Sequence, residues 1–332
     1  MTKWSRDPLM ASFQAVTIEL PEAPTYAGEP ERSLCATLVR RNPPEHKRAM
    51  LYIHGWNDYF FQTQLADEMA HLDYDFHALD LRRYGRSLRP GQLAGFVSDL
   101  SAYHEELDEA VRIIRHEGHD EIVVMGHSTG GLIAALWADE RPGVASALVL
   151  NAPWLELQGY PAVRPALLPM FSAVRTLSPT AALPLSETGF YRRTISASED
   201  GVWDYNLNLK GDKAFAVRVG WLAAIMQGQA KVSAGLTIDV PIAVFLSDRS
   251  DFRRKWSEDL RCADVVLDVD TLASRAPNLG RHVTLIRIEG GMHDLALSDE
   301  PARTRYYAEV RRWLSAYGHG NLQRATAQKA LH

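Results

Sequence analysis

The first half of the chain alternates short apolar runs with polar breaks. Runs rich in β-branched and other apolar residues predict strands at residues 14–20, 33–40, 49–53 and 76–81. The first two runs alternate apolar with polar positions across a loop of prolines and glycine, which indicates an antiparallel pair. Helices are predicted at residues 59–72, with Asn57 or Asp58 as the cap, and at residues 98–117, where the pattern is amphipathic.

Residues 121–136, EIVVMGHSTGGLIAAL, predict a strand, a sharp turn and a helix in direct succession. Ser128 lies in the turn, with Gly126 and Gly130 as its second neighbours. The turn is so tight that a Cβ at either glycine is expected to collide with neighbouring backbone. The pattern is typical of a nucleophile elbow, which presents the serine hydroxyl.

Beyond this turn the alternation continues and then fails. A strand is predicted at residues 145–150, so strands and helices alternate up to this point and favour a mostly parallel sheet with helices on both faces. Residues 154–238 contain several prolines, a helix candidate at residues 215–227 and no clear strand. Because their apolar groups are large and dense, we interpret them as a helical cap inserted over the sheet.

Strand signal returns at residues 240–246 and 282–288, and residues 301–316 predict a closing amphipathic helix. The polar tail is expected to fray. The predicted organisation is therefore an α/β core of residues 1–153 and 239–317, a cap of residues 154–238 and a tail of residues 318–332.

Composition places the chain among soluble globular proteins, with 46% apolar and 23% charged residues. A formal net charge of −5 provides no basic surplus, so neither nucleic acid nor an anionic membrane surface is predicted as a partner. Cys35 and Cys262 lie in no disulfide or metal-ligand spacing, and no signal peptide or integral membrane segment is apparent. We expect a cytoplasmic protein, and the sequence does not predict an oligomeric state.

Ser128 needs a base before it can act as a nucleophile. A histidine takes the proton of a serine hydroxyl, and a carboxylate holds the histidine in the required tautomer. Among the 12 histidines, His293 stands out because GGMHD at residues 290–294 forms a loop after a strand near the end of the chain. His293 is therefore the candidate base, and the adjacent Asp294 is expected to point away from it.

Four motifs carry a family resemblance: His54-Gly55, the run from Asp80 to Ser87, GHSTGG at residues 126–131, and Gly291-Met292-His293. With them the chain resembles the serine α/β-hydrolases over residues 49–153 and 240–315. It looks most like the monoacylglycerol lipase and lysophospholipase branch, which overlaps in pattern with the serine aminopeptidases. The resemblance implies the α/β-hydrolase fold, a triad in the chain order serine, acid, histidine, and an oxyanion hole made by the backbone amides of Trp56 and Thr129.

The acid of the triad has three candidates. Asp264 leaves room for one helix, at residues 271–279, and one strand before His293, as the fold requires. Asp248 directly follows its strand, and Asp251 has a plausible offset. Asp264 is the predicted acid, with Asp248 and then Asp251 as alternatives. An insertion of about a dozen residues before Asp264 explains the late position.

A second departure from the family pattern is Arg83, which occupies a position where the family has glycine. The loop after the strand at residues 76–81 is therefore predicted to differ in shape from that of the family.

The leading functional prediction is hydrolysis of a small-molecule carboxylic ester with a small or medium apolar acyl group, without a cofactor or metal. Candidate substrate contacts in the cap are Leu168, Phe171, Trp221 and Met226, whose alternative role is packing of the cap itself. HEGH at residues 116–119 has metal-compatible residue types but no third ligand, and predicts a solvated turn. A carbon-carbon bond hydrolase, a peptidase, an acyltransferase and a non-catalytic receptor for a small ligand remain open.

Overall fold

One central sheet organises the molecule, which is described here from a computed structural model. The structure describes residues 3–30, 34–41, 43–157, 178–184, 188–211 and 215–318. Within these ranges the strands are β1 (Ser5–Arg6), β2 (Gln14–Leu20), β3 (Leu34–Arg40), β4 (Arg48–Ile53), β5 (Tyr74–Asp80), β6 (Glu121–His127), β7 (Ala147–Asn151), β8 (Ile242–Ser247) and β9 (Val283–Ile288). The helices are α1 (Thr63–Ala70), α2 (His104–His116), α3 (Thr129–Glu140), α5 (Phe190–Ile195), α6 (Val219–Ala234), α7 (Val269–Arg275) and α8 (Ala302–Tyr317).

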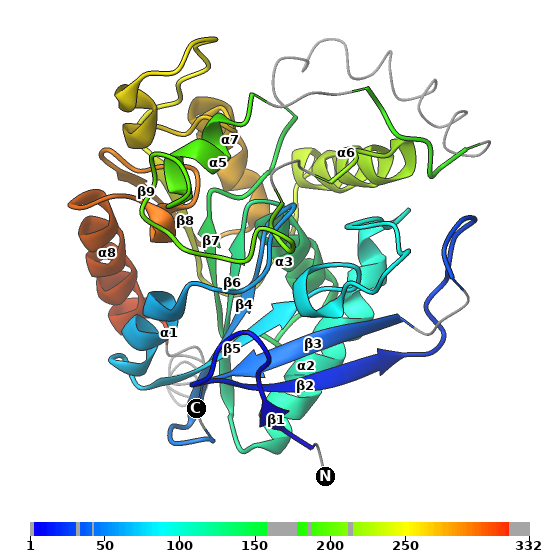
Figure 1. Cartoon of the computed structure of the whole chain (residues 1–332). Helices are drawn as coiled ribbons and strands as arrows, with labels where there is room; N and C mark the ends of the chain where they lie inside the picture. The colour runs from blue at the N-terminus through cyan, green and yellow to red at the C-terminus, as the bar shows by residue number, and fades with distance from the viewer. Residues whose placement is uncertain are drawn as a thin grey trace.

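The strand order is β1-β2-β3-β5-β4-β6-β7-β8-β9 (Figure 1). Strands β4 to β9 pair in parallel, whereas β1, β2 and β3 pair antiparallel with their neighbours. The predicted antiparallel opening and the mostly parallel sheet are thereby confirmed. The parallel strands are nearly continuous apolar runs in the sequence, because helices cover both of their faces.

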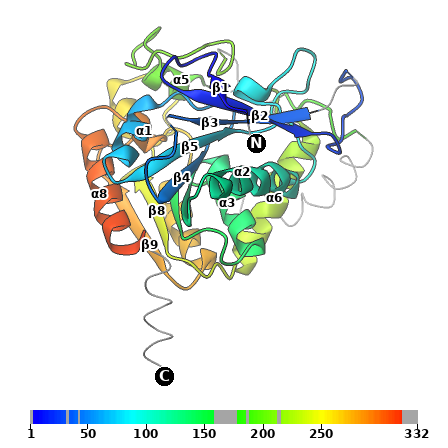
Figure 2. The ribbon, with the colours of Figure 1, turned by 90° about the horizontal axis from the view of Figure 1, so that it is seen from below.

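Side chains of β4 divide between the two faces of the sheet with a period of two residues. Leu51 and Ile53 join the cluster formed with α2, α3 and α6, while Met50 and Tyr52 join the cluster formed with α1 and α8. Figure 2, along the sheet, shows α1 and α8 on one side and α2, α3 and α6 on the other. The carboxyl ends of the parallel strands are thus held at one edge of a layered core.

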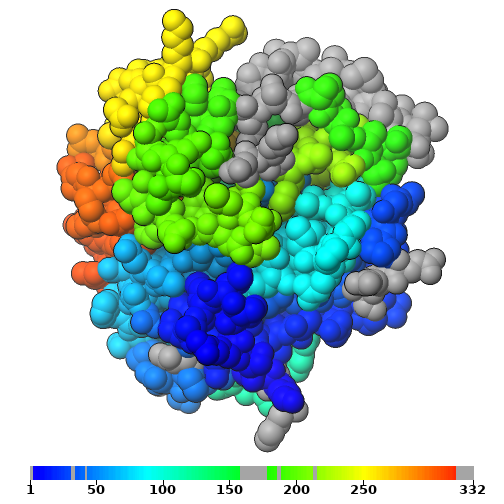
Figure 3. Space-filling model, in the orientation of Figure 1, coloured from blue at the N-terminus to red at the C-terminus, as the bar shows by residue number. Residues whose placement is uncertain are grey.

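Residues 152–241, between β7 and β8, form what we call the inserted segment. Its described residues include α5 and α6, which lie at the top of the view in Figure 1. The helix predicted at residues 215–227 begins later, at Val219, because Arg218 is extended and forms an isolated bridge with Ala182. Figure 3 shows the described part of this segment in green. It lies between the yellow stretch around residue 255 and the N-terminal half of the chain, which is blue and cyan.

The predicted cap of the first helix is wrong. Helix α1 begins at Thr63 with Gln62 at the cap position, not with Asn57 or Asp58. The Asp58 carboxylate lies before the helix, is buried and accepts a hydrogen bond from Lys210 Nζ at 2.7 Å. No helix within the described ranges is long and apolar enough to cross a bilayer.

Candidate active site

Ser128 lies at the junction of β6 and α3 in a strained backbone conformation. Its φ of 51° and ψ of −116° are rare for a residue with a side chain, and such strain persists where the surrounding structure imposes it. A Cβ on Gly126 would lie 2.5 Å from the carbonyl oxygen of Gly130, and one on Gly130 would overlap the carbonyl of His54. The predicted need for glycine at both positions is confirmed.

His293 lies in the loop after β9, with its ring directed at Asp264. The Nδ1 atom of His293 is 2.9 Å from Oδ2 of Asp264, and both residues are buried. The other carboxylate oxygen accepts hydrogen bonds from the backbone N–H groups of Val266 and Leu267, at 2.8 and 2.7 Å. Because a carboxylate only accepts, His293 donates from Nδ1, and in the neutral ring Nε2 is left as a base.

Of the three candidate acids, the structure brings only Asp264 to His293. Asp248 instead accepts a hydrogen bond from the backbone N–H of Gly290 at 2.9 Å, and Asp251 pairs with Arg253 at 2.7 Å. The backbone of Asp251 donates to the carbonyl of Asp264 at 2.9 Å. Residues 252–262 therefore leave the end of β8 and return to it, and Asp264 comes to lie beside the residues that directly follow the strand.

The loop after β4 runs beside Ser128. A Cβ on Gly55 would lie 3.2 Å from Cβ of Ser128, so only glycine lets the backbone pass this closely. Thr129 is the first residue of α3, where backbone N–H groups have no partner within the helix. Among the described residues, no hydrogen bond engages the N–H of Trp56 or of Thr129. The oxyanion-hole role of these two N–H groups stays a prediction.

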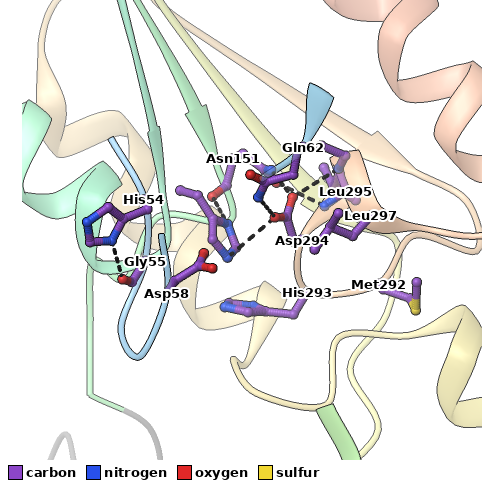
Figure 4. A network of polar contacts seen from close by, with 12 residues as sticks. His54, Gly55, Asp58, Gln62, Asn151, Met292, His293, Asp294, Leu295 and Leu297 are labelled. Carbon is purple, nitrogen blue, oxygen red and sulfur yellow. Dashed lines mark hydrogen bonds and ion pairs between the residues drawn. The ribbon is translucent and has the colours of Figure 1, made fainter. Parts of the chain in front are cut away.

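Asp294 points away from His293, as expected. It is fully buried and accepts hydrogen bonds from Asn151 Nδ2 at 2.7 Å and Gln62 Nε2 at 3.2 Å (Figure 4). His127 lies between the two, with its ring centroid 4.9 Å from that of His293. Burial lowers the pKa of His127, so this ring stays neutral beside the candidate base.

A cavity of about 760 Å³ opens at the carboxyl ends of the strands. Ser128 and His293 both line it, although no hydrogen bond among the described residues joins their side chains. Apolar side chains from the inserted segment and from the acid loop form part of the wall: Leu183, Ile195, Phe215, Val217, Val265 and Val266. The cavity has the size and lining typical of a site for a small organic molecule.

The predicted cap contacts lie elsewhere or outside the described residues. Trp221 and Met226 are 3% and 1% exposed, and neither is among the residues that line the cavity. Trp221 packs against Trp56 with ring centroids 3.7 Å apart, which favours the packing alternative. Leu168 and Phe171 fall outside the described residues.

Sequence reasoning missed several polar or aromatic residues of the cavity, and four of these are used below: Asp58, Tyr191, Tyr205 and Lys210. Three of them belong to the inserted segment, where neither period-2 nor helical patterning singles out any position. Lys210 is one of many charged residues in this segment, so the sequence offered no signal that singles it out.

The mostly parallel sheet, the serine turn after β6 and the His–Asp contact at the same edge define the α/β-hydrolase fold. The structure is similar to that of a soluble variant of monoglyceride lipase from Saccharomyces cerevisiae, with a TM-score of 0.61 and 15% sequence identity. That similarity covers 88% of this chain and 96% of the lipase chain.

The family model described as serine aminopeptidase, S33, matches residues 44–300, and the chain belongs to this family. One relative is 1-acylglycerol-3-phosphate O-acyltransferase ABHD5 of Rattus norvegicus, 26% identical over 68% of this chain and 71% of that protein. Another is the uncharacterized protein YnbC of Escherichia coli (strain K12), 31% identical over 37% of this chain and 22% of that protein. The sequence-based resemblance to this family is confirmed.

Proposed function

We propose that this α/β-hydrolase cleaves carboxylic esters through Ser128, His293 and Asp264. The observation that carries the proposal is the 2.9 Å contact between His293 Nδ1 and Asp264 Oδ2, beside a cavity that Ser128 also lines. A buried carboxylate that fixes the tautomer of a histidine next to a strained serine is the arrangement that activates a serine nucleophile.

In the proposed mechanism Ser128 Oγ attacks the ester carbonyl carbon while His293 Nε2 takes the hydroxyl proton. The N–H groups of Trp56 and Thr129 bind the oxyanion of the tetrahedral intermediate. His293 then donates the proton to the leaving alcohol, and the acyl group remains on Ser128. Water, activated by His293, attacks the acyl-enzyme and releases the carboxylic acid. The serine–histidine hydrogen bond of such sites often tightens only when substrate binds.

Residues 154–238 of the inserted segment are proposed to act as a cap over the cavity. Its side chains Leu183, Ile195 and Val217 supply apolar wall to the cavity, which suits a small or medium acyl chain. The substrate is therefore proposed to be a neutral small-molecule ester.

Acyl transfer is a second candidate, favoured by the similarity to a relative described as an O-acyltransferase. The same acyl-enzyme would then be attacked by an acceptor hydroxyl instead of water. Product analysis with 1-acylglycerol-3-phosphate as acceptor separates the two: a diacylated product indicates transfer, and free fatty acid alone indicates hydrolysis.

Labelling with a fluorophosphonate tests the proposed nucleophile. The folded wild type is expected to gain one covalent adduct at Ser128, detectable by intact mass and peptide mapping. Ser128→Ala is expected to gain none. Labelling of the variant at the wild-type rate, or an unlabelled wild type, would refute the nucleophile and would favour the alternative of a non-catalytic receptor.

A further inference from the structure

Lys210 places a positive charge inside the cavity. It belongs to the inserted segment, is 6% exposed and lines the same cavity as Ser128. Its Nζ atom donates to Oδ1 of Asp58 at 2.7 Å. A lone charge buried in this way is costly, so the carboxylate is needed to hold it there.

Three aromatic rings surround the same ammonium group. Nζ lies 5.2 Å from the ring centroid of Phe61, 5.6 Å from that of Tyr191 and 5.8 Å from that of Tyr205. Each distance is within the range at which a cation is attracted to a ring face. Several aromatic rings around one cation form the kind of cage in which proteins bind organic ammonium ions.

Asp58 carries the negative charge that holds a cation at this point of the cavity. Burial alone would raise the pKa of Asp58, but Lys210, His54 and His127 outweigh burial and lower it, so the carboxylate is ionised at neutral pH. The residue is 1% exposed, and its Oδ2 atom has no hydrogen-bond partner among the described residues. One oxygen of this cavity-lining carboxylate is therefore buried without a partner among the described residues.

We propose that the cavity contains an ammonium-binding subsite which the protein's own Lys210 fills, and that Lys210 thereby selects neutral substrates against substrates that carry an organic cation. The inference rests on the proposed ester hydrolysis and names the substrate class that the site rejects. A cationic substrate would meet the like charge of Lys210 and a carboxylate that is already paired. The free amino terminus of a peptide is such a cation, so aminopeptidase action is disfavoured as well.

The test compares two esters of the same shape, butyrylcholine and its uncharged isostere 3,3-dimethylbutyl butyrate. Wild type is expected to favour the neutral ester in kcat/KM by about tenfold or more, and Lys210→Ala to shift this ratio toward the choline ester by about tenfold to a hundredfold. The control is Lys231→Ala, which removes an exposed lysine paired with Glu140 at 3.0 Å and is expected to keep the wild-type ratio. Equal use of both esters by wild type would overturn the proposal.

A binding measurement separates this proposal from the proposed hydrolysis. Tetramethylammonium chloride is expected to raise the melting temperature of Lys210→Ala in a saturable way relative to sodium chloride at equal ionic strength, and to leave wild type unchanged. The Asp58→Asn, Lys210→Met double variant removes both buried charges, remains available if the single variant does not fold, and is expected to show no shift. A folded Lys210→Ala protein without a tetramethylammonium shift would refute the subsite, whether or not any ester is hydrolysed.

Discussion

Asp264, the proposed acid, shows at the residue scale how the sequence left the partner of His293 open. Sequence alone left three aspartates open, because the spacing favoured Asp264 while Asp248 and Asp251 directly follow the strand. The 252–262 excursion resolves the conflict by returning the chain to the end of β8, with Asp264 N–H donating to the carbonyl of Arg249 at 3.0 Å. An excursion of this kind depends on tertiary contacts that no local pattern encodes.

The first prediction compares two asparagine variants. Asp264→Asn is expected to lower kcat for p-nitrophenyl esters by about 10⁴-fold, because an amide can no longer hold His293 in the required tautomer. Asp248→Asn serves as the matched control. It alters only the hydrogen bond to the Gly290 backbone, so a modest change in rate is expected. Loss of activity in folded Asp248→Asn with retention in Asp264→Asn would reverse the assignment.

Arg83 is a second residue at which the sequence departs from the family pattern. Its φ of 64° is in the left-handed region that glycine favours, so the residue differs from the family pattern while the backbone stays glycine-like. Two hydrogen bonds to Glu29, at 2.7 and 2.6 Å, stabilise the arginine in that conformation. The predicted difference in loop shape therefore receives no support from the backbone of Arg83.

At the scale of elements, the end of α2 and the start of β5 form a buried polar cluster at the amino ends of the parallel strands, opposite the serine turn. The prediction of a solvated turn at residues 116–119 is wrong for His119, which is 1% exposed. Its Nε2 atom is 2.8 Å from the Asp75 carboxylate, and its Nδ1 atom is 2.8 Å from the carbonyl of Ile114. Both nitrogens face acceptors, which favours the doubly protonated ring. Sequence could not show this, because the partners come together only when α2 packs on the sheet.

The second prediction is a pH-dependent contribution of His119 to stability. Burial lowers the pKa of His119, but the hydrogen bonds to Asp75 and Ile114 outweigh it and raise the pKa above the ordinary 6.5. The pairing of His119 with Asp75 therefore contributes fully to stability below about pH 6.5. This contribution is lost as the pH rises through the raised pKa of His119. The pKa of Asp75 is lowered from its ordinary value of 3.8. The stabilisation that the Asp75 carboxylate contributes is therefore lost only as the pH falls below 3.8.

The measurement is the melting temperature of wild type and His119→Gln at pH 6 and pH 9. The variant is expected to be less stable by about 2 °C or more at pH 6, and the difference is expected to shrink at pH 9. His77, with its ring 5.5 Å away, and Glu117, which pairs with His77, are present in both proteins. A difference that grows toward pH 9 would contradict the proposed ion pair.

At the scale of the whole molecule, the fold class and most elements follow from the sequence, whereas the sheet order does not. Strand β5 lies between β3 and β4, an order set by how the β4-α1-β5 crossover packs. The Ser128 turn was predictable because its glycines obey a local steric rule. The cavity residues of the inserted segment were not predictable, because its contributions to the cavity come from single side chains such as Lys210.

The third prediction concerns acyl length and uses the whole cavity. A volume of about 760 Å³ with several aliphatic side chains in its wall is expected to favour p-nitrophenyl hexanoate or octanoate over acetate. The gain in kcat/KM is expected to be about tenfold to a hundredfold, because each buried methylene contributes about 0.8 kcal/mol at most. A preference for acetate in the purified protein would count against an acyl-binding role for this cavity.

The most direct test of ester hydrolysis at Ser128 is the turnover of p-nitrophenyl hexanoate by wild type and Ser128→Ala under identical conditions. The variant is expected to fold, since Ser128 Oγ makes no hydrogen bond to any described residue, and alanine removes only that atom. Its kcat is expected to fall by about 10⁴-fold or more. Wild-type turnover in the folded variant would contradict the account.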